Sequence, residues 1–461
     1  DIYYTLDGTI PDENDIPYTG AVTVEKTTPI RAVACRDGYL PSSAGCATYL
    51  IGENIHLPVV SIVTDQANLF DEETGIYADG PGWTREYPHE GSNYWKDWER
   101  PAHMELLEPD GTVGISQDIG IKIFGGWSRA EEKKSFSLMS RGKYGNSSFD
   151  YQVFPELPYQ SYRHLVIRNG GQDAIVSRIR DKLQVDLALE TSDLDGQAHR
   201  QSILFINGEF WGIYDLMEKV NEHFIALHHG VNPDKIDLLV KKGDVILGSN
   251  EEYMALIEYV KTHDLSVQAN YDYVASKIDI DNYIDWCAIE MYTTNRDLSN
   301  IKFWRPQSAD GKWRWIIYDL DWGFYHLYHE RWKDYLDIFN LFLDSSNEQE
   351  FDNILIRKLL ENTGFKEQFI KRFVYHCTVT FDPDKVVHRI NTLSDNIRPY
   401  IAREMGKWND SPVETWDQEY LQRLRDYATD RPAINLRSMQ QYFGLSDAEM
   451  DALLSQQEAG Q

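Results

Sequence analysis

The sequence predicts an α+β protein with two lobes, preceded by a small all-β domain. Three observations lead to this fold class. Residues 1–50 are short β-rich runs separated by turns, residues 57–215 are mostly strand-like, and residues 216–445 show mostly helical periodicity. Strands that precede helices, instead of alternating with them, are typical of α+β proteins. The 461 residues are enough for two or three domains, each with its own core.

The N-terminal domain covers residues 1–50. It runs from YYTLDGTIPD to AVTVEKTTPIRAVACRDGYLPSS, and two Asp-Gly turns separate its β-rich runs. Because no helical period is visible, we expect a small β-sandwich, truncated by the absence of its first strand.

The four cysteines are too few for a disulfide scaffold. Cys35 and Cys46 lie close together in sequence, and the sequence leaves open whether they pair. Cys287 and Cys377 fall in apolar helical patterns, which favours buried free thiols.

The first lobe, residues 57–215, follows a linker at 51–58. LPVVSIVTD is typical of a buried strand, and HMELLEPDGTVGIS contains a Pro-Asp-Gly turn typical of a hairpin. GIKIF, KKSFSLMSR and HLVIRN are further strands, and Asn207-Gly208 predicts a tight hairpin turn. Residues 175–190 have the helical spacing of apolar residues.

The second lobe, residues 216–445, is expected to be mainly helical. MEKVNEHFIALHHG ends in a glycine C-cap, and Asp279 and Asp281 are capping candidates before NYIDWCAIEMYTT. One hairpin, IKFWR to WRWIIYDLD, interrupts the helices at residues 301–321. Residues 446–461 are expected to form a C-terminal tail.

The composition excludes some partners. The 45 basic and 74 acidic residues give a formal net charge of −29, which would repel a nucleic-acid backbone or an anionic membrane. No run of about 18 apolar residues exists, so we expect no membrane span. A basic protein, a cation or a neutral sugar fits this charge.

Several common motifs are absent. The sequence contains no GxxxxGKS/T, GxGxxG, HExxH or GxSxG pattern. SDLDG at 192–196 resembles the start of a calcium loop, but Leu204 occupies the position of the bidentate glutamate, so we reject an EF-hand. His326 and His329 have ligand-like spacing, but no third ligand is in view.

The stretch NRDLSNIKFWR…GKWRWIIYDLDWGF, residues 295–324, carries the most specific pattern. A helix ends near Thr294, Asp297 and Asn300 follow, and a hairpin then leads to Asp319 and Asp321. Phosphoryl transfer needs one carboxylate for the attacking hydroxyl, and an amide oxygen and a second carboxylate for Mg²⁺. The alternative is a purely structural role, in which Asp297 and Asn300 form a turn and DLD is a solvated strand end.

A lysine forms the second element of the pattern. In KKSFSLMSR, the period of a strand puts Lys134, Phe136 and Leu138 on one face, with Lys133 pointing the other way, toward solvent. Lys134 either snorkels or points into a polar cleft. Glu218 could orient it through an ion pair, or could serve as a carboxylate at a helix N-terminus.

At these residues the sequence resembles the CotH kinase family, the bacterial spore-coat-protein-H-like atypical protein kinases. The similarity runs over most of residues 57–440, and its blocks occur in family order. They include LPVVSIVTDQANLFDEETGIY, IKIFGGWSRAEEKKSFSLMSRGKYG, VIRNGGQD with SRIRD, FINGEFWGIYDLMEKV, NRDLSNIKFW and WRWIIYDLDWGF. Residues 3–49 separately resemble the chitobiase C-terminal-like immunoglobulin-type module.

The resemblance implies a kinase-like fold, ATP, Mg²⁺ or Mn²⁺, and phosphorylation of protein Ser/Thr. It implies Asp297 as catalytic base, Asp319, Asn300 and Asp321 at the metal, and Lys134 at the ATP phosphates with Glu218 as its partner. Arg129 of the Gly-Ser-Arg loop would add a phosphate contact. The DxxN spacing is tighter than the DxxxxN of ordinary protein kinases.

Three hypotheses therefore stand. The first is an extracellular or cell-surface bacterial kinase whose signal sequence is absent from these residues and whose substrate is a basic protein. The second is a catalytically silent kinase-like surface protein that binds cell wall or carbohydrate through its N-terminal module and its Trp and Tyr residues. The third is a glycoside hydrolase, since paired carboxylates and aromatic platforms also serve that chemistry.

Overall fold

The computed structural model describes residues 1–295, 297, 300–324, 338–345, 352–409 and 411–458. The protein is a mixed α+β structure, as the sequence predicts. It divides into two compact units that are discontinuous in sequence. Unit 1 consists of Asp1–Ala174, Ala198–Lys219 and Asn396–Ser411, and unit 2 of Ile175–Gln197, Val220–Asp395 and Pro412–Gln461. The predicted division at 215/216 therefore differs from these units in two segments: residues 175–197 belong to unit 2, and residues 396–411 belong to unit 1.

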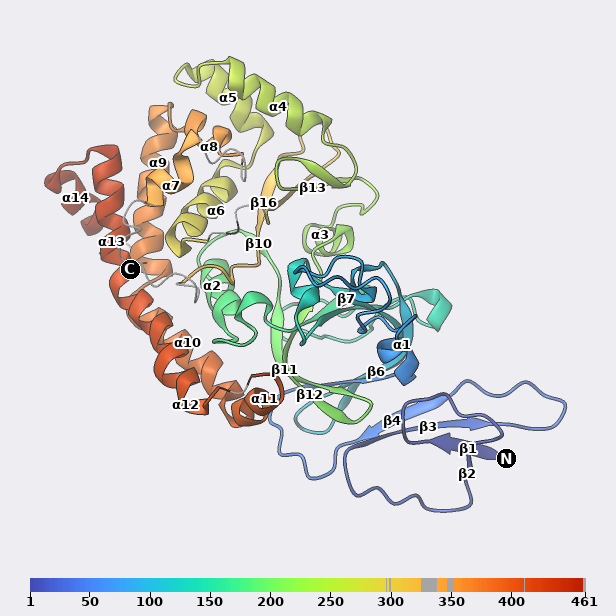
Figure 1. The fold of residues 1–461 in the computed structure, drawn as a ribbon. Coiled ribbons are helices and arrows are strands. Elements are labelled where there is room, and N and C mark those ends of the chain that lie inside the picture. Colours follow the sequence, from blue (N-terminus) through green and yellow to red (C-terminus); the bar gives the residue numbers. More distant parts are fainter. Residues whose placement is uncertain (296, 298–299, 325–337, 346–351, 410, 459–461) are drawn as a thin grey trace. The chain divides into compact units, whose positions relative to one another are not determined.

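The N-terminal domain is a single antiparallel sheet in the order β2-β1-β3-β4 (Figure 1). Its strands are β1 (Ile2–Thr5), β2 (Ile16–Pro17), β3 (Thr28–Ala34) and β4 (Gly45–Tyr49). The expected sandwich of two sheets is not found within residues 1–50, all of which are described.

All four cysteines are free thiols. Cys35 is buried, and burial raises the pKa of the Cys46 thiol to about 12, so Cys46 does not ionise at neutral pH. The open question of a Cys35–Cys46 disulfide is answered in the negative for this structure. Cys287 and Cys377 are buried free thiols, which confirms their prediction.

A closed barrel forms the body of unit 1, in the order β11-β12-β9-β8-β7-β6-β5. Its pairs are antiparallel except for the closing pair of β5 and β11, which is parallel. Closure leaves no exposed strand edge in the ring. The strands are β5 (Val59–Val63), β6 (Arg100–Leu107), β7 (Val113–Phe124), β8 (Ser135–Met139), β9 (His164–Arg168), β11 (His199–Ile206) and β12 (Glu209–Glu218).

Local sequence explains these strands. Every residue of β5 is buried, as its continuous apolar run predicts. The hairpin of β11 and β12 turns at Asn207 and Gly208, which both have positive φ (49° and 78°). That geometry is typical of the type I′ turn that Asn-Gly favours. Unit 1 also contains the short helix α1 (Gln66–Phe70) and α11 (Ile401–Trp408).

The prediction that Lys133 points to solvent is wrong. Its side chain is 3% exposed, and its ammonium group lies 2.6 Å from the Glu404 carboxylate of α11. Strand β8 begins only at Ser135, so the strand alternation used for the prediction does not extend to Lys133. The partner comes from a helix 271 residues further along the chain, which local pattern cannot reveal.

Unit 2 contains a five-stranded sheet in the order β10-β16-β15-β13-β14. Its strands are β10 (Asp195–Gly196), β13 (Ile236–Val240), β14 (Asp244–Leu247), β15 (Lys302–Pro306) and β16 (Arg314–Ile317). The hairpin of β15 and β16 is the predicted one. The hairpin of β13 and β14 was not predicted, because β14 is short and largely exposed and so lacks a clear apolar alternation.

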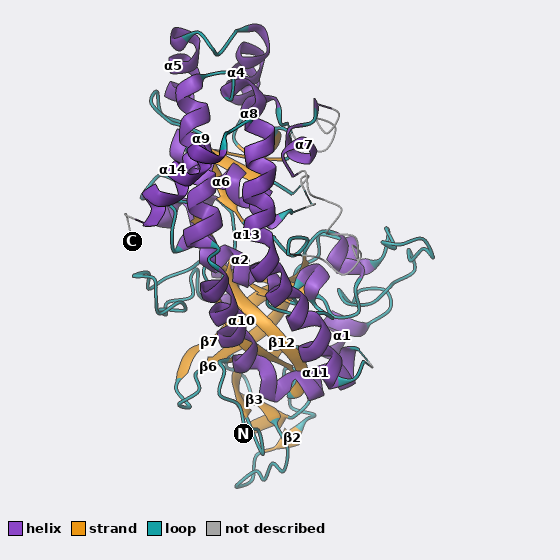
Figure 2. Cartoon of the chain, turned by 90° about the vertical axis from the view of Figure 1, so that its left-hand side faces the viewer, coloured by secondary structure: helices purple, strands orange, loops and turns teal. Residues whose placement is uncertain are grey.

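Helices make up the rest of unit 2, as Figure 2 shows in purple. They are α2 (Arg180–Leu189), α3 (Glu222–His229), α4 (Glu251–Thr262), α5 (Gln268–Lys277), α6 (Ile280–Thr293), α7 (Ile338–Leu343), α8 (Ile354–Leu359), α9 (Thr363–Tyr375), α10 (Pro383–Ile397, ending at the unit boundary), α12 (Val413–Thr415), α13 (Gln422–Phe443) and α14 (Asp447–Glu458). Helices α4 and α5 lie side by side in both views (Figures 1 and 2). The expected C-terminal tail is a helix, α14.

Two predicted helix ends are confirmed. The Asp279 side chain accepts a hydrogen bond from the Asn282 amide at the start of α6. Gly230 ends α3 in the left-handed conformation. A membrane-spanning helix is not found among the described residues.

Candidate active site

The turn after α6 holds the first two predicted site residues. Thr294 ends the helix in the left-handed conformation. The Asn295 side chain then accepts a hydrogen bond from the Asp297 amide (3.2 Å), and the Asn300 amide donates to the Asp297 carbonyl (3.2 Å). Asp297 and Asn300 are therefore presented from one tight turn of unit 2.

The end of β16 brings Asp319 to this turn. The side-chain amide nitrogen of Asn300 donates a hydrogen bond to the Asp319 carboxylate. The Tyr318 hydroxyl donates to the side-chain amide oxygen of Asn300 (2.7 Å). Asp319 has φ of +61°, a left-handed conformation that is uncommon for a residue other than glycine. Such backbone strain is concentrated at functional sites. The structure therefore joins the two acidic segments that the sequence singled out.

Glu290 adds a third carboxylate that the sequence analysis missed. It lies on α6, is 4% exposed, and accepts a hydrogen bond from the Asn295 side chain (3.0 Å). Burial raises the pKa of Glu290 to about 8; the hydrogen bond from Asn295 opposes the shift, and the charges of Asp297 and Asp319 add to it. The signal in the sequence was an acidic residue within an otherwise apolar helix face.

Tyr318 and Lys302 complete the surroundings of the carboxylates. Burial, together with the charges of Asp319, Asp297 and Glu290, holds the pKa of Tyr318 well above its usual value, so its hydroxyl stays a donor. The Lys302 ammonium lies 4.4 Å from the centre of the Tyr318 ring. A cation next to these acidic groups is another feature that sequence spacing did not indicate.

The donor chemistry of this cluster fits a hard divalent cation. Asp319 and Asn300 offer carboxylate and amide oxygens, and Asp321, which is 4% exposed, follows two residues later on the same loop. Mg²⁺ takes one or two carboxylates and completes its shell with water and phosphate oxygens. Among the described residues, no group of three or more His, Cys, Asp or Glu forms a metal cage of protein ligands alone.

Lys134 and Arg129 meet in unit 1, in the loop that joins β7 and β8. The Lys134 ammonium donates to the carbonyls of Arg129 and Glu131, at 2.7 Å each, and lies 3.9 Å from the centre of the Tyr94 ring. Burial lowers the pKa of Lys134 to about 8, against the opposing charges of Asp79, Glu131 and Glu132. Lys134 therefore fixes the short 3₁₀ turn at Trp127–Ala130.

Arg129 and Glu218 each form a hydrogen bond with a backbone group of unit 1. The Arg129 guanidinium donates to the Gly125 carbonyl (2.5 Å), and burial lowers its pKa. The Glu218 carboxylate accepts a hydrogen bond from the Ala198 amide (3.0 Å). Lys134 forms no ion pair with any described residue, so the predicted pair with Glu218 is wrong. Glu218 is the last residue of β12, and its carboxylate instead accepts a hydrogen bond from the residue that precedes β11.

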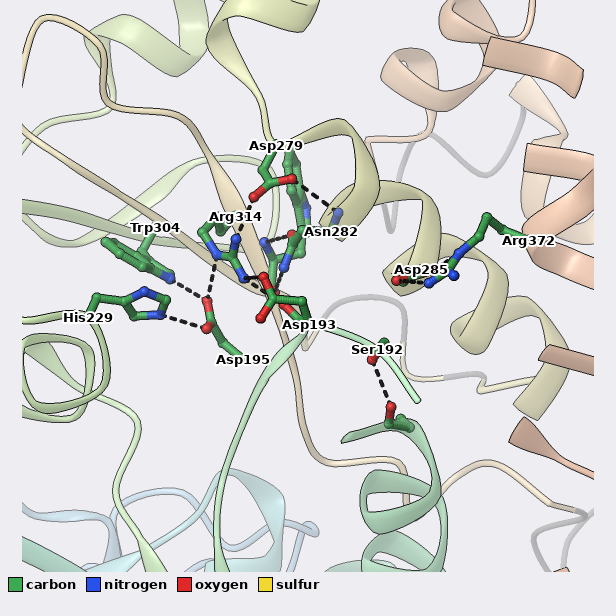
Figure 3. A network of polar contacts seen from close by, with 12 residues as sticks. Ser192, Asp193, Asp195, His229, Asp279, Asn282, Asp285, Trp304, Arg314 and Arg372 are labelled. Carbon is green, nitrogen blue, oxygen red and sulfur yellow. Dashed lines mark hydrogen bonds and ion pairs between the residues drawn. The ribbon is translucent and has the colours of Figure 1, made fainter. Parts of the chain in front are cut away.

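The SDLDG segment binds an arginine. Figure 3 shows Asp193, Asp195 and Asp279 around Arg314 of β16. Asp195 also accepts hydrogen bonds from His229 (2.7 Å) and Trp304 (2.8 Å). Burial opposes its ionisation, but these partners lower its pKa below the usual value. The network joins β10 and α3 to strands β15 and β16 of the sheet.

The two histidines with ligand-like spacing, His326 and His329, lie outside the described residues.

Comparisons with known proteins identify the family of the chain. Residues 121–434 match the family model described as CotH kinase protein, and residues 1–49 match the one described as Fn3 associated. The chain is 23% identical over 372 residues to the inner spore coat protein H of Bacillus subtilis (strain 168), which covers 74% of this chain and 92% of that protein. The matched family segment contains all seven predicted site residues and more than half of the chain. The chain therefore belongs to the CotH kinase protein family.

Proposed function

We propose that this protein is an atypical protein kinase that transfers the γ-phosphoryl group of ATP to Ser or Thr of a protein. The observation that carries the proposal is the direct hydrogen bond between Asn300 and Asp319, with Asp297 on the same turn as Asn300. Family membership supports it, because the family is described as a kinase family. A kinase-like pairing of a β-rich and a helical lobe is part of the proposal.

Each residue has a chemical role in the proposed transfer. Asp297 accepts the proton of the attacking hydroxyl, whose oxygen bonds to the γ-phosphorus while the bond from that phosphorus to the β–γ bridging oxygen breaks. Asp319 and Asn300, with Asp321 as second ligand or support, would hold Mg²⁺ or Mn²⁺, which neutralises charge on the phosphates. Tyr318 orients the Asn300 amide so that one oxygen lone pair stays available.

The loop at residues 125–131 would contact the phosphates of ATP. Lys134 shapes this loop through two carbonyl hydrogen bonds, and Arg129 lies within it. Their positive charges, and the backbone amides of the 3₁₀ turn, suit an anionic ligand. No standard glycine-rich phosphate loop exists in the chain, so this loop is its replacement in the proposal.

The substrate is proposed to be a basic protein at the bacterial surface. A net charge of −29 attracts positively charged partners and accelerates their encounter. The related protein in Bacillus subtilis is named an inner spore coat protein, which supports a surface-associated location for this chain as well.

Transfer of radiolabelled phosphate from ATP to a basic, serine-rich protein tests the proposal. We expect transfer by the wild type with Mg²⁺ or Mn²⁺ and a loss of at least about a hundredfold in Asp297→Asn, as for removal of a general base. Asp310→Asn is the matched control, because Asp310 is an exposed carboxylate at the turn of the same hairpin. Equal transfer by wild type and Asp297→Asn would remove Asp297 from its role.

A binding role for the N-terminal domain is a second candidate. Tyr18 and Tyr39 are 52% and 68% exposed on this domain, and exposed aromatic rings suit stacking against sugars. Sedimentation with insoluble cell-wall polysaccharide tests this role. We expect co-sedimentation of the full chain to fall in the Tyr18→Ala/Tyr39→Ala variant; equal co-sedimentation would contradict it.

A further inference from the structure

Three side chains of helix α2 form hydrogen bonds with the loop that carries Asp319 and Asp321. The Leu320 amide, between the two aspartates, donates a hydrogen bond to the Asp181 carboxylate (2.8 Å). The Gln184 side-chain amide donates to the Leu320 carbonyl (2.8 Å). The two peptide units on either side of the Leu320 Cα, 319–320 and 320–321, are therefore each held by one side chain of the same helix.

The same helix also holds the end of the loop. The Arg180 guanidinium donates to the carbonyls of Gly323 (3.0 Å) and Phe324. Gly323 is required here by close approach, since an added Cβ would lie 2.3 Å from the Gln184 side-chain oxygen. The glycine of the DLDWG motif thus makes room for Gln184 of α2, a residue 139 positions earlier in the chain.

Burial makes these contacts strong and specific. Arg180, Asp181 and Gln184 are at most 4% exposed, so water does not replace a lost hydrogen bond easily. The second oxygen of Asp181 accepts a hydrogen bond from the buried Lys182 ammonium at 2.8 Å, so both carboxylate oxygens are bound.

We propose that Asp181 and Gln184 are positioning residues of the candidate metal site, because they fix the peptide units that join Leu320 to Asp319 and to Asp321 and thereby aim the two carboxylates. This inference rests on the proposed function for the identity of the bound group. Asp319 needs such support, since its left-handed backbone has to be held against relaxation. Partners behind the ligands of a metal commonly change its affinity 10- to 100-fold.

The test measures the Mn²⁺ concentration that gives half-maximal ATP binding, and the thermal midpoint, for each variant. We expect Asp181→Ala to raise this Mn²⁺ concentration about tenfold or more. Asp181→Asn keeps an oxygen acceptor for Leu320 and should raise the Mn²⁺ concentration less than Asp181→Ala does, although it removes the carboxylate partner of Lys182. Gln184→Met keeps the volume, removes the amide donor and should fall between the two, which preserves the test if Asp181→Ala does not fold.

The matched control is Asp186→Asn on the same helix. Asp186 pairs with Arg389 at 2.9 Å, away from the loop, so its substitution should leave the Mn²⁺ requirement unchanged. An unchanged Mn²⁺ requirement in both Asp181→Ala and Gln184→Met would overturn the inference. So would an equal rise in Asp186→Asn, because the effect would then come from general weakening of α2.

Hydrogen exchange separates this inference from the proposed function. In the absence of nucleotide, the peptide that contains Leu320 should take up deuterium faster in Gln184→Met than in wild type, while Asp186→Asn should match wild type. If exchange is faster in Gln184→Met but the wild type shows no Mn²⁺-dependent ATP binding, the proposed function and the metal site are both overturned. The conclusion that α2 supports the loop would still hold. Equal exchange in all three proteins would overturn that support.

Discussion

Single residues at the turn after α6 and at the end of β16 carry the proposed function. Asp319 adopts φ of +61°, which costs about 1 kcal/mol or more for a residue with a Cβ. The cost is sustained because Asn300 binds the carboxylate and the neighbouring peptide is fixed. A residue held in this way meets a ligand without reorganising, which is the condition for electrostatic stabilisation of a transition state.

Glu290 should make stability depend on pH. Its pKa is raised to about 8 in the folded protein, while the unfolded chain has an ordinary value near 4.5. Between these two values the folded state holds one proton more, so the free energy of unfolding falls as pH rises from about 4.5 to 8. Glu290→Gln stays neutral at every pH, and we expect its unfolding curve to lack this fall. Urea unfolding at pH 5.5, 7 and 8.5 would measure it; parallel pH profiles of the two proteins would contradict the assignment.

Part of the candidate site follows from the sequence. The order helix, DxxN, hairpin, DxD indicated Asp297, Asn300 and Asp319, because residues near each other in the chain frame one hairpin. Lys133 was misjudged because its partner Glu404 lies far along the chain, and Glu218 because it pairs with Ala198 across the β11–β12 hairpin. Glu290, Asp181 and Gln184 were missed for the same reason: a buried polar residue in a helix carries no local sign of what it contacts.

At the scale of elements, α11 is fixed to the barrel through a buried ion pair. Lys133 and Glu404 are 3% and 0% exposed at their side chains, and Glu404 also accepts a hydrogen bond from the Ile213 amide of β12 (2.8 Å). A helix from late in the sequence thus packs against a barrel that earlier strands form. Such long-range contacts are why unit 1 is discontinuous.

Removing one partner of this pair should be strongly destabilising. Glu404→Ala leaves the Lys133 charge buried without its carboxylate, and we expect a loss of about 3–5 kcal/mol in the free energy of unfolding. The double variant Lys133→Met/Glu404→Leu removes both charges and should recover most of the loss. Denaturant unfolding of the three proteins measures this; a loss below about 1 kcal/mol in Glu404→Ala would show that the pair is not buried as described.

Most elements were predictable because their apolar patterns are local. The strands of the barrel and helices α2, α3, α4 and α6 followed from period and turn residues. The hairpin of β13 and β14 and the terminal helix α14 did not, since β14 is mostly exposed and α14 buries little of its surface. The N-terminal domain showed its strands but not its single sheet, because strand period says nothing about how many layers form.

At the scale of the whole molecule, the net charge of −29 is the dominant property. The proposed attraction of a basic substrate acts over distances that salt screens, with a Debye length of about 10 Å at 0.1 M. We expect the KM for a basic protein substrate to rise several-fold between about 50 and 300 mM NaCl, with little change in kcat. A neutral Ser-containing peptide is the control and should show a flat salt dependence; a flat dependence for both would exclude a role of the acidic surface in encounter.

The central claim is that Asp319 helps to hold a metal–nucleotide complex, and calorimetry of ATP binding tests it most directly. ATP would be titrated with Mg²⁺, with Mn²⁺ and with no metal into wild type, Asp319→Ala and the control Asp310→Ala. We predict metal-dependent binding by wild type and by Asp310→Ala, and none by Asp319→Ala. No binding by the wild type with either metal, or undiminished binding by Asp319→Ala, would contradict it.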